Sequence, residues 1–121
     1  MADGSEYSDY MVAFSTAPSI EEARRIAHDV VENRLAACVN LVTGIVSVYE
    51  WEAEIHEDPE VLLVMKTREA LVRRLIARIV EIHPYDCPEV VVLPILGGNK
   101  AYLDWIETVT GEKETLEESE P

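Results

Sequence analysis

The sequence has few cysteines, no long apolar run and no glycine-rich phosphate loop. Its two cysteines, Cys38 and Cys87, have no Cys-x-x-Cys spacing and are too few for a disulfide-framed secreted domain, so we expect reduced thiols. The longest apolar runs, of about five to seven residues, fall far below the roughly 18 that span a bilayer. No basic segment followed by an apolar stretch opens the chain. These absences predict a cytoplasmic protein.

Basic residues are also scarce, since 10 lysines and arginines stand against 24 aspartates and glutamates for a net charge of −14. A surface this acidic repels phosphate backbones, so we expect neither nucleic acid nor membrane as a partner. Gly97-Gly98-Asn99 reads as a turn with a helix cap, and no nucleophile elbow is present. We therefore expect a protein that is not an enzyme and has no organic cofactor.

The 48% hydrophobic content of the 121 residues is enough for one domain with a real core. We place this domain at residues 10–111, between acidic tails at 1–9 and 112–121. Apolar periods of two and 3.6 residues predict its elements. They are strands at 10–16, 36–51, 60–66 and 90–93, helices at 19–33, 67–82 and 99–110, and a turn at 52–59.

This order of elements is typical of the α+β, ferredoxin-like split βαβ fold (βαββαβ) with an added C-terminal helix. Such a fold has an antiparallel sheet with both principal helices on one face. Ser19 and Thr67 are expected to cap the first two helices. Thr43-Gly44 marks a bulge, because the apolar positions of the long strand change from odd to even there.

The long hairpin is too long for its helices. A strand of about 15 residues spans about 50 Å, whereas a helix of that length covers about 22 Å. Apolar side chains on the overhang need cover. The strands at 11–14, 61–65 and 90–93 also read as buried on both faces, which predicts an obligate oligomer. The residues that we assign to this interface are Val46, Val48, Tyr49 and Trp51.

The segment from His83 to Glu89 is expected to form a rigid turn at the rim of a site, because Pro84 and Pro88 exclude a helix. His83 either binds a metal ion or lies at the end of the preceding helix, and Cys38 is either a ligand or a small core residue. Asp86 and Glu89 form either a carboxylate pair or a solvated turn. The side chains that we expect to line a cleft are Lys66, Tyr85, Asp86 and Cys87. We place His56 in the turn at 52–59, as either a solvated loop residue or part of a loose cation site.

Several separated motifs, in order, resemble the CutA divalent-cation-tolerance family over about residues 11–110. They are Ser15-Thr16-Ala17-Pro18, Arg34-Leu35-Ala36-Ala37-Cys38-Val39-Asn40, Tyr49-Glu50-Trp51, Lys66-Thr67, His83-Pro84-Tyr85, Pro88-Glu89, Leu93-Pro94-Ile95, and Asn99 with Tyr102-Leu103-Asp104-Trp105. The resemblance implies a ferredoxin-like protomer and a homotrimer whose hairpins clasp neighbouring subunits. It also implies a cytoplasmic role in tolerance of divalent metal ions, with binding of copper, Cu(II), or a similar divalent cation.

The metal ligands of the family carry over only in part. A cysteine of metal-binding members is replaced by Ser15, and one histidine of a pair by Ile82, which leaves His83, with Cys38 at a family position. Two other hypotheses stay open. The architecture is similar to that of the trimeric PII signalling proteins, which suggests a sensor or scaffold that binds a small molecule or protein between subunits. The third is an intersubunit hydrolase or lyase.

Overall fold

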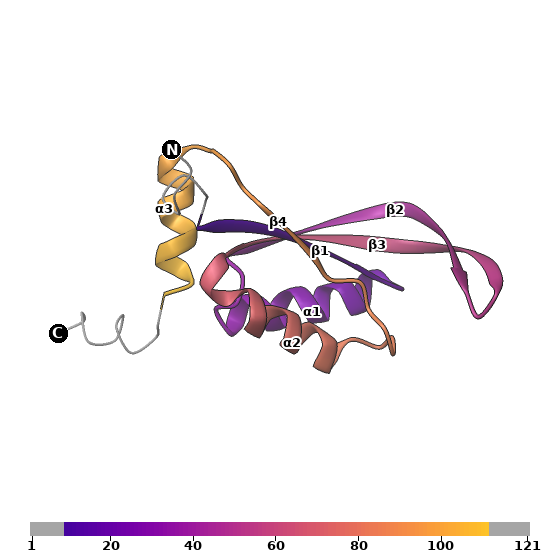
Figure 1. Ribbon diagram of the computed structural model, residues 1–121. Helices are drawn as coiled ribbons and strands as arrows, with labels where there is room; N and C mark the ends of the chain where they lie inside the picture. Colours follow the sequence, from indigo (N-terminus) through magenta and orange to yellow (C-terminus); the bar gives the residue numbers. More distant parts are fainter. Residues whose placement is uncertain (1–8, 112–121) are drawn as a thin grey trace.

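The computed structural model describes residues 9–111 and shows one four-stranded antiparallel sheet, with the helices at 20–32 and 72–82 on one face and the helix at 100–109 across one end (Figure 1). The strand order is β2-β3-β1-β4. The elements in chain order are β1 (Tyr10–Ala17), α1 (Ile20–Glu32), β2 (Cys38–Trp51), β3 (Glu54–Arg68), the 3₁₀ turn η2 (Glu69–Leu71), α2 (Val72–Ile82), β4 (Val91–Pro94) and α3 (Lys100–Val109). This is the predicted α+β ferredoxin-like arrangement. The predicted tails lie outside the described residues, except Asp9.

The core lies between the sheet and helices α1 and α2. Odd-numbered residues of β1 and β3 face the helices in register, with Ala13 opposite Met65 and Ala17 opposite Val61. The small residues of β1 let α1 approach the sheet closely, and Ile26 of α1 is fully buried there. As predicted, the Ser19 side chain caps α1 by accepting a hydrogen bond from the Glu22 amide at 3.2 Å.

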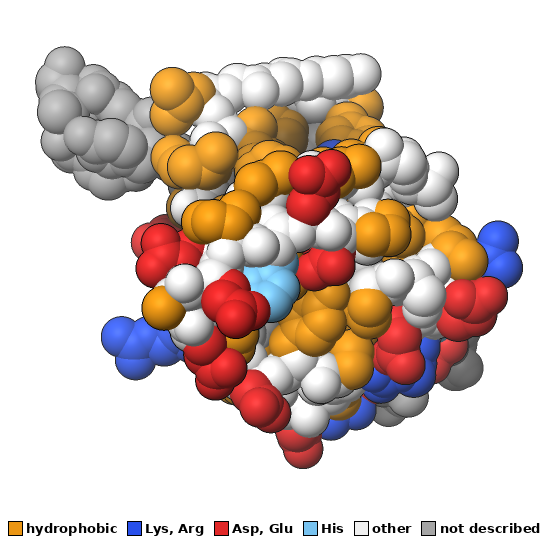
Figure 2. Space-filling model, turned by 90° about the vertical axis from the view of Figure 1, so that its right-hand side faces the viewer, with side chains coloured by type: hydrophobic (Ala, Val, Ile, Leu, Met, Phe, Trp, Pro, Cys, Tyr) orange, Lys and Arg blue, Asp and Glu red, His pale blue; other side chains and the backbone are white. Residues whose placement is uncertain are grey.

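The hairpin of β2 and β3 extends well beyond α1 and α2 (Figure 1). The predicted bulge is confirmed, because the β2–β3 register shifts between Val42 and Ile45, and Gly44 has a φ of 83°. In the extension Val48 is 65% exposed and Ile55 72% exposed. Apolar and acidic side chains lie side by side on the surface seen from the hairpin end (Figure 2). The predicted overhang is therefore present in the single chain.

The prediction of a turn over residues 52–59 is wrong. The chain reverses within two residues, Glu52 and Ala53, whose φ angles of 53° and 68° suit a tight hairpin turn. Strand β3 begins directly at Glu54, so His56 lies in a strand and not in a loop. Before Val61 strand β3 pairs only with β2, and a strand with one free side accommodates Pro59.

One other sequence prediction also needs correction. Thr67 does not cap a helix; it is a buried residue of β3 whose hydroxyl donates to the Leu35 carbonyl at 2.7 Å. In the single chain, strand β4 lies at the sheet edge with Val91 50% and Leu93 54% exposed, so the burial of both its faces stays a prediction for the assembly. No helix of the described residues is long and apolar enough to cross a membrane.

Candidate functional site

A groove of about 680 Å³ lies between the β2–β3 hairpin and the segment that follows α2. Its volume is within the range typical of small-molecule sites. The residues that line it are Thr16, Ser47, Val48, Tyr49, Trp51, Glu60, Pro84, Tyr85, Asp86, Cys87 and Glu89. The rim predicted from the two prolines is therefore one wall of a groove, and the hairpin is the other.

His83 anchors this rim. Pro84 favours extended backbone at the residue before it, and His83 ends α2 with φ −75° and ψ 144°. Its buried ring accepts a hydrogen bond at Nδ1 from the Tyr85 amide at 3.1 Å, so Nε2 carries the proton and donates to the Thr16 carbonyl at 2.7 Å. Both ring nitrogens are thus engaged. Of the two alternatives for His83, a residue at the end of the preceding helix is the one that matches this position.

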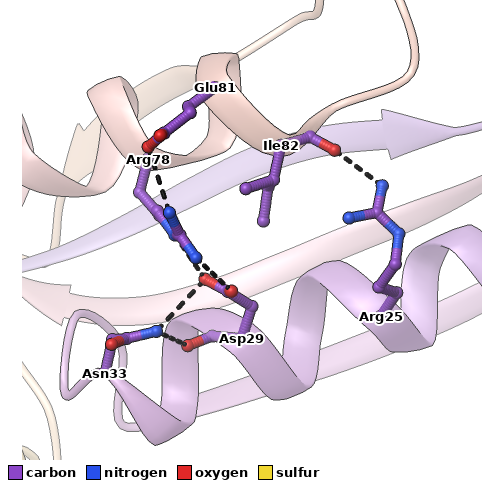
Figure 3. Close-up of polar contacts among 6 residues, drawn as sticks. All are labelled: Arg25, Asp29, Asn33, Arg78, Glu81 and Ile82. Carbon is purple, nitrogen blue, oxygen red and sulfur yellow. Dashed lines mark hydrogen bonds and ion pairs between the residues drawn. The ribbon is translucent and has the colours of Figure 1, made fainter.

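Two arginine contacts hold the end of α2 against α1 (Figure 3). The Arg25 guanidinium donates to the Ile82 carbonyl at 2.6 Å, one residue before His83. One turn earlier, Arg78 donates to both carboxylate oxygens of Asp29. These contacts satisfy a carbonyl at the helix end and fix where the rim begins.

Glu60 is the best-held carboxylate of the groove. Its Oε1 accepts from the Ser47 hydroxyl at 2.6 Å and its Oε2 from the Tyr85 hydroxyl at 2.7 Å. Burial, together with the neighbouring Glu60, raises the pKa of Tyr85 well above its ordinary value of 10.0. Tyr85 therefore stays a phenol and a hydrogen-bond donor at neutral pH.

Tyr49 forms the hairpin wall of the groove. Its hydroxyl donates to Asp58, which raises the pKa of Tyr49 above 10.0, and its ring stacks on His56 with centroids 5.3 Å apart. Trp51 lies two residues further along the same strand and also lines the groove. These aromatic side chains face the rim because β2 pairs with β3 directly across the two-residue turn at 52–53.

The predicted cleft residues Tyr85, Asp86 and Cys87 all line the groove. Lys66 does not; its ammonium donates to the Asn40 side chain on the sheet. Of the predicted interface residues, Val48, Tyr49 and Trp51 also line the groove, whereas Val46 lies outside it and is 59% exposed. The groove and the predicted interface therefore overlap.

The two predicted metal ligands do not come together. Cys38 lies opposite Lys66, which pairs with Val12, whereas His83 binds Thr16, four residues further along β1. Four strand residues span about 13 Å. Within residues 9–111 there is no group of three or more histidines, cysteines or carboxylates placed to hold a metal ion.

Thr16, Ser47 and Glu60 are groove residues that the sequence reading missed. Ser47 and Glu60 meet because a two-residue turn at 52–53 and the bulge after Val42 set the pairing of the hairpin. A Ser on one strand and a Glu on the next carry no signal until that register is known. The tight turn, if recognised, would have brought them together.

The chain resembles known proteins over nearly all of its described length. The family model of the CutA1 divalent ion tolerance protein matches residues 11–109. The divalent-cation tolerance protein CutA of Thermus thermophilus is 50% identical over 100 residues, which make up 83% of this chain and 97% of that protein. The CutA protein of Mus musculus is 47% identical over 111 residues, or 90% of this chain, but this chain spans only 63% of the mouse protein.

The fold agrees with the sequence match. A crystal structure of CutA1 from Oryza sativa superposes with a TM-score of 0.84 at 44% identity, over 89% of this chain and 99% of that one. CutA1 of Thermus thermophilus superposes with a TM-score of 0.82 at 49% identity, over 84% of this chain and 99% of that one. Sequence motifs, fold and matched length agree: the chain belongs to the CutA1 divalent ion tolerance family.

Proposed function

We propose that this chain acts in tolerance of divalent metal ions as a cytoplasmic homotrimer that binds copper or a similar divalent cation, without catalysing a reaction. The observation that carries the proposal is the family match over residues 11–109. The net charge of −14 supports it, because an acidic surface raises the local concentration of cations.

The trimer is supported by apolar side chains that a single chain leaves in water. They lie on the hairpin and on the sheet face opposite the helices; examples are Val42, Val48, Ile55, Val91 and Leu93. Exposed apolar area of this extent is typical of a protein interface. Sedimentation equilibrium at micromolar concentration should give three chain masses, and a folded single chain would contradict the trimer.

A copper or zinc site normally takes three or four nitrogen or sulfur donors. The described residues of one chain do not supply such a set, since Cys38 and His83 are apart and both nitrogens of His83 are already bonded. Cys38 is partly exposed near the end of the sheet that β2 shares with β3. We therefore propose that donors from a neighbouring copy complete any site that uses its thiol.

Calorimetric titration tests cation binding directly. Zinc(II) is used beside copper(II), because copper(II) oxidises thiols. We expect saturable binding by the native protein and at least about tenfold weaker binding by Cys38→Ser, a loss of about 1.4 kcal/mol. His83→Ala should keep the native affinity, because both ring nitrogens of His83 are bonded within the chain. Cys87→Ser is the matched control, since Cys87 is exposed and lies in the groove. Equal affinity in the native protein and Cys38→Ser would exclude the Cys38 thiol as a ligand, and weaker binding by His83→Ala would show that its ring leaves these hydrogen bonds to bind the ion.

A second candidate function is a PII-like sensor or scaffold that binds a small molecule between subunits. The groove beside Tyr85 favours it, because its volume suits a small ligand and it overlaps the predicted interface. A thermal-shift screen of metabolites on the assembled protein tests this candidate. A screen in which no compound raises the melting temperature would count against it.

A further inference from the structure

The groove combines acidic and aromatic side chains and is lined by no lysine or arginine. Its carboxylates are Glu60, Asp86 and Glu89, and its aromatic rings are Tyr49, Trp51 and Tyr85. The three rings are between 36% and 49% exposed in the single chain. Because Tyr49 and Trp51 are also predicted interface residues, a ligand here would lie between subunits, as the second candidate function requires. An anionic ligand would be repelled by this lining, whereas a cation would be attracted.

Glu60 is already oriented for a ligand. Ser47 and Tyr85 each occupy one lone pair, on different carboxylate oxygens, and each oxygen keeps a second lone pair. Asp86 and Glu89 form no hydrogen bond or ion pair with other described residues. A carboxylate that is held before binding loses less freedom on binding. The groove therefore offers acceptors for several N–H donors.

The aromatic walls distinguish an organic cation from a bare metal ion. A cation within about 6 Å of a tryptophan or tyrosine ring face is attracted by the ring quadrupole, and its carbon chain buries apolar surface against the ring. A metal ion instead needs a compact set of ligands, which the described residues lack. The groove volume of about 680 Å³ is also far larger than a metal ion requires.

We propose that this groove binds an organic cation with ammonium or guanidinium N–H donors, held by Glu60, Asp86 and Glu89 against Trp51 and Tyr85. The inference rests on the second candidate function and names the ligand class for it. It is separate from metal binding at Cys38, because the Cys38 side chain does not line the groove.

Fluorescence of the assembled, full-length protein tests this proposal. The chain has two tryptophans, so Trp105→Phe leaves Trp51 as the reporter of the groove. The probes are agmatine and spermidine in about 150 mM salt, which screens weak surface attraction. We expect a saturable change in Trp51 fluorescence as either probe is added, with a Kd below about 1 mM. Magnesium chloride serves as the inorganic comparison.

Glu60→Gln should weaken agmatine binding at least about tenfold, because it removes the oriented charge and keeps the shape of the side chain. Glu89→Gln is a second variant in the groove, in case the first perturbs folding. Glu57→Gln is the matched control, since Glu57 lies on the same strand outside the groove and loses the same charge. We expect it to change the Kd by less than about twofold.

Three results would overturn the proposal. The first is no saturable binding up to about 10 mM agmatine. The second is that Glu57→Gln weakens agmatine binding as much as Glu60→Gln does. The third is that magnesium displaces agmatine when the two cations are present at the same concentration of positive charge. The first also covers a groove that a basic side chain of a neighbouring copy fills. Loss of agmatine binding with intact zinc binding in calorimetry would refute the groove ligand alone. The reverse result would refute the metal site alone.

Discussion

Arg78 on α2 clasps Asp29 on α1 through two parallel hydrogen bonds, from Nε to Oδ1 at 2.8 Å and from Nη2 to Oδ2 at 2.7 Å (Figure 3). The pair is partly shielded, because the Asp29 side chain is only 22% exposed. Hydrogen bonding from Arg78 lowers the pKa of Asp29 below its ordinary value of 3.8. The pair joins the two helices that position the rim.

Asp29→Asn should lower the free energy of unfolding at pH 7 by about 1 kcal/mol. Because the folded-state pKa is lowered, the stabilisation is fully present above pH 3.8 and is lost as the pH falls through the folded-state value. Urea denaturation at several pH values and constant protein concentration measures this. The control is Glu81→Gln, whose side chain is 69% exposed. A deficit in Asp29→Asn that stays constant down to pH 2 would contradict the assignment.

His83→Ala should lower the free energy of unfolding by about 2 kcal/mol, because it leaves the buried Thr16 carbonyl without its donor. Amide exchange should also speed up at Tyr85, whose N–H loses its acceptor. The matched control is His28→Ala, since His28 is exposed on α1. Equal stability of both variants would show that His83 does not anchor the rim.

Ser15→Ala should raise the free energy of unfolding by about 1 kcal/mol. The Ser15 hydroxyl is fully buried in β1 and has no hydrogen-bond partner among the described residues, so its removal relieves a desolvation cost. Thr67→Val is the contrasting variant, because that buried hydroxyl donates to the Leu35 carbonyl. It should lower stability by about 1 kcal/mol. Thermal unfolding at fixed concentration would show shifts of opposite sign, and shifts of the same sign would argue against this account.

Gly44→Ala should destabilise the protein by about 1 kcal/mol through the backbone alone. A Cβ at this position would meet no atom within 4 Å, but its φ of 83° lies in the left-handed region. A Cβ at Gly97 would also meet no atom within 4 Å, but Gly97 has no positive φ, so we expect no loss of stability in Gly97→Ala. Chemical denaturation of both variants separates backbone strain from the general effect of replacing glycine by alanine. An equal loss of stability in both would refute strain at the bulge.

Local sequence patterns were sufficient to predict the helices, because an apolar face and a capping residue mark a helix within a few positions. Ser19 capped α1 and Asn99 capped α3 as expected, since these hydrogen bonds join residues two or three apart. The bulge at Gly44 was visible because the apolar parity changes there. The two prolines likewise predicted the rim with Tyr85, Asp86 and Cys87, which line the groove.

The tertiary structure decided what faces the rim. The pairing of β2 with β3 decides whether residues 52–59 form a loop or a tight turn with a strand. The acidic residues and Pro59 of this segment wrongly indicated a loop. That register brings Ser47 to Glu60, and Glu60 to Tyr85 across 25 positions. The sequence by itself thus determined the order of the elements and the presence of a rim, because short-range periodicity and backbone restriction encode both. Contacts between residues far apart in the chain decided which carboxylate lies in the groove and that both ring nitrogens of His83 are bonded, and no local pattern encodes such contacts.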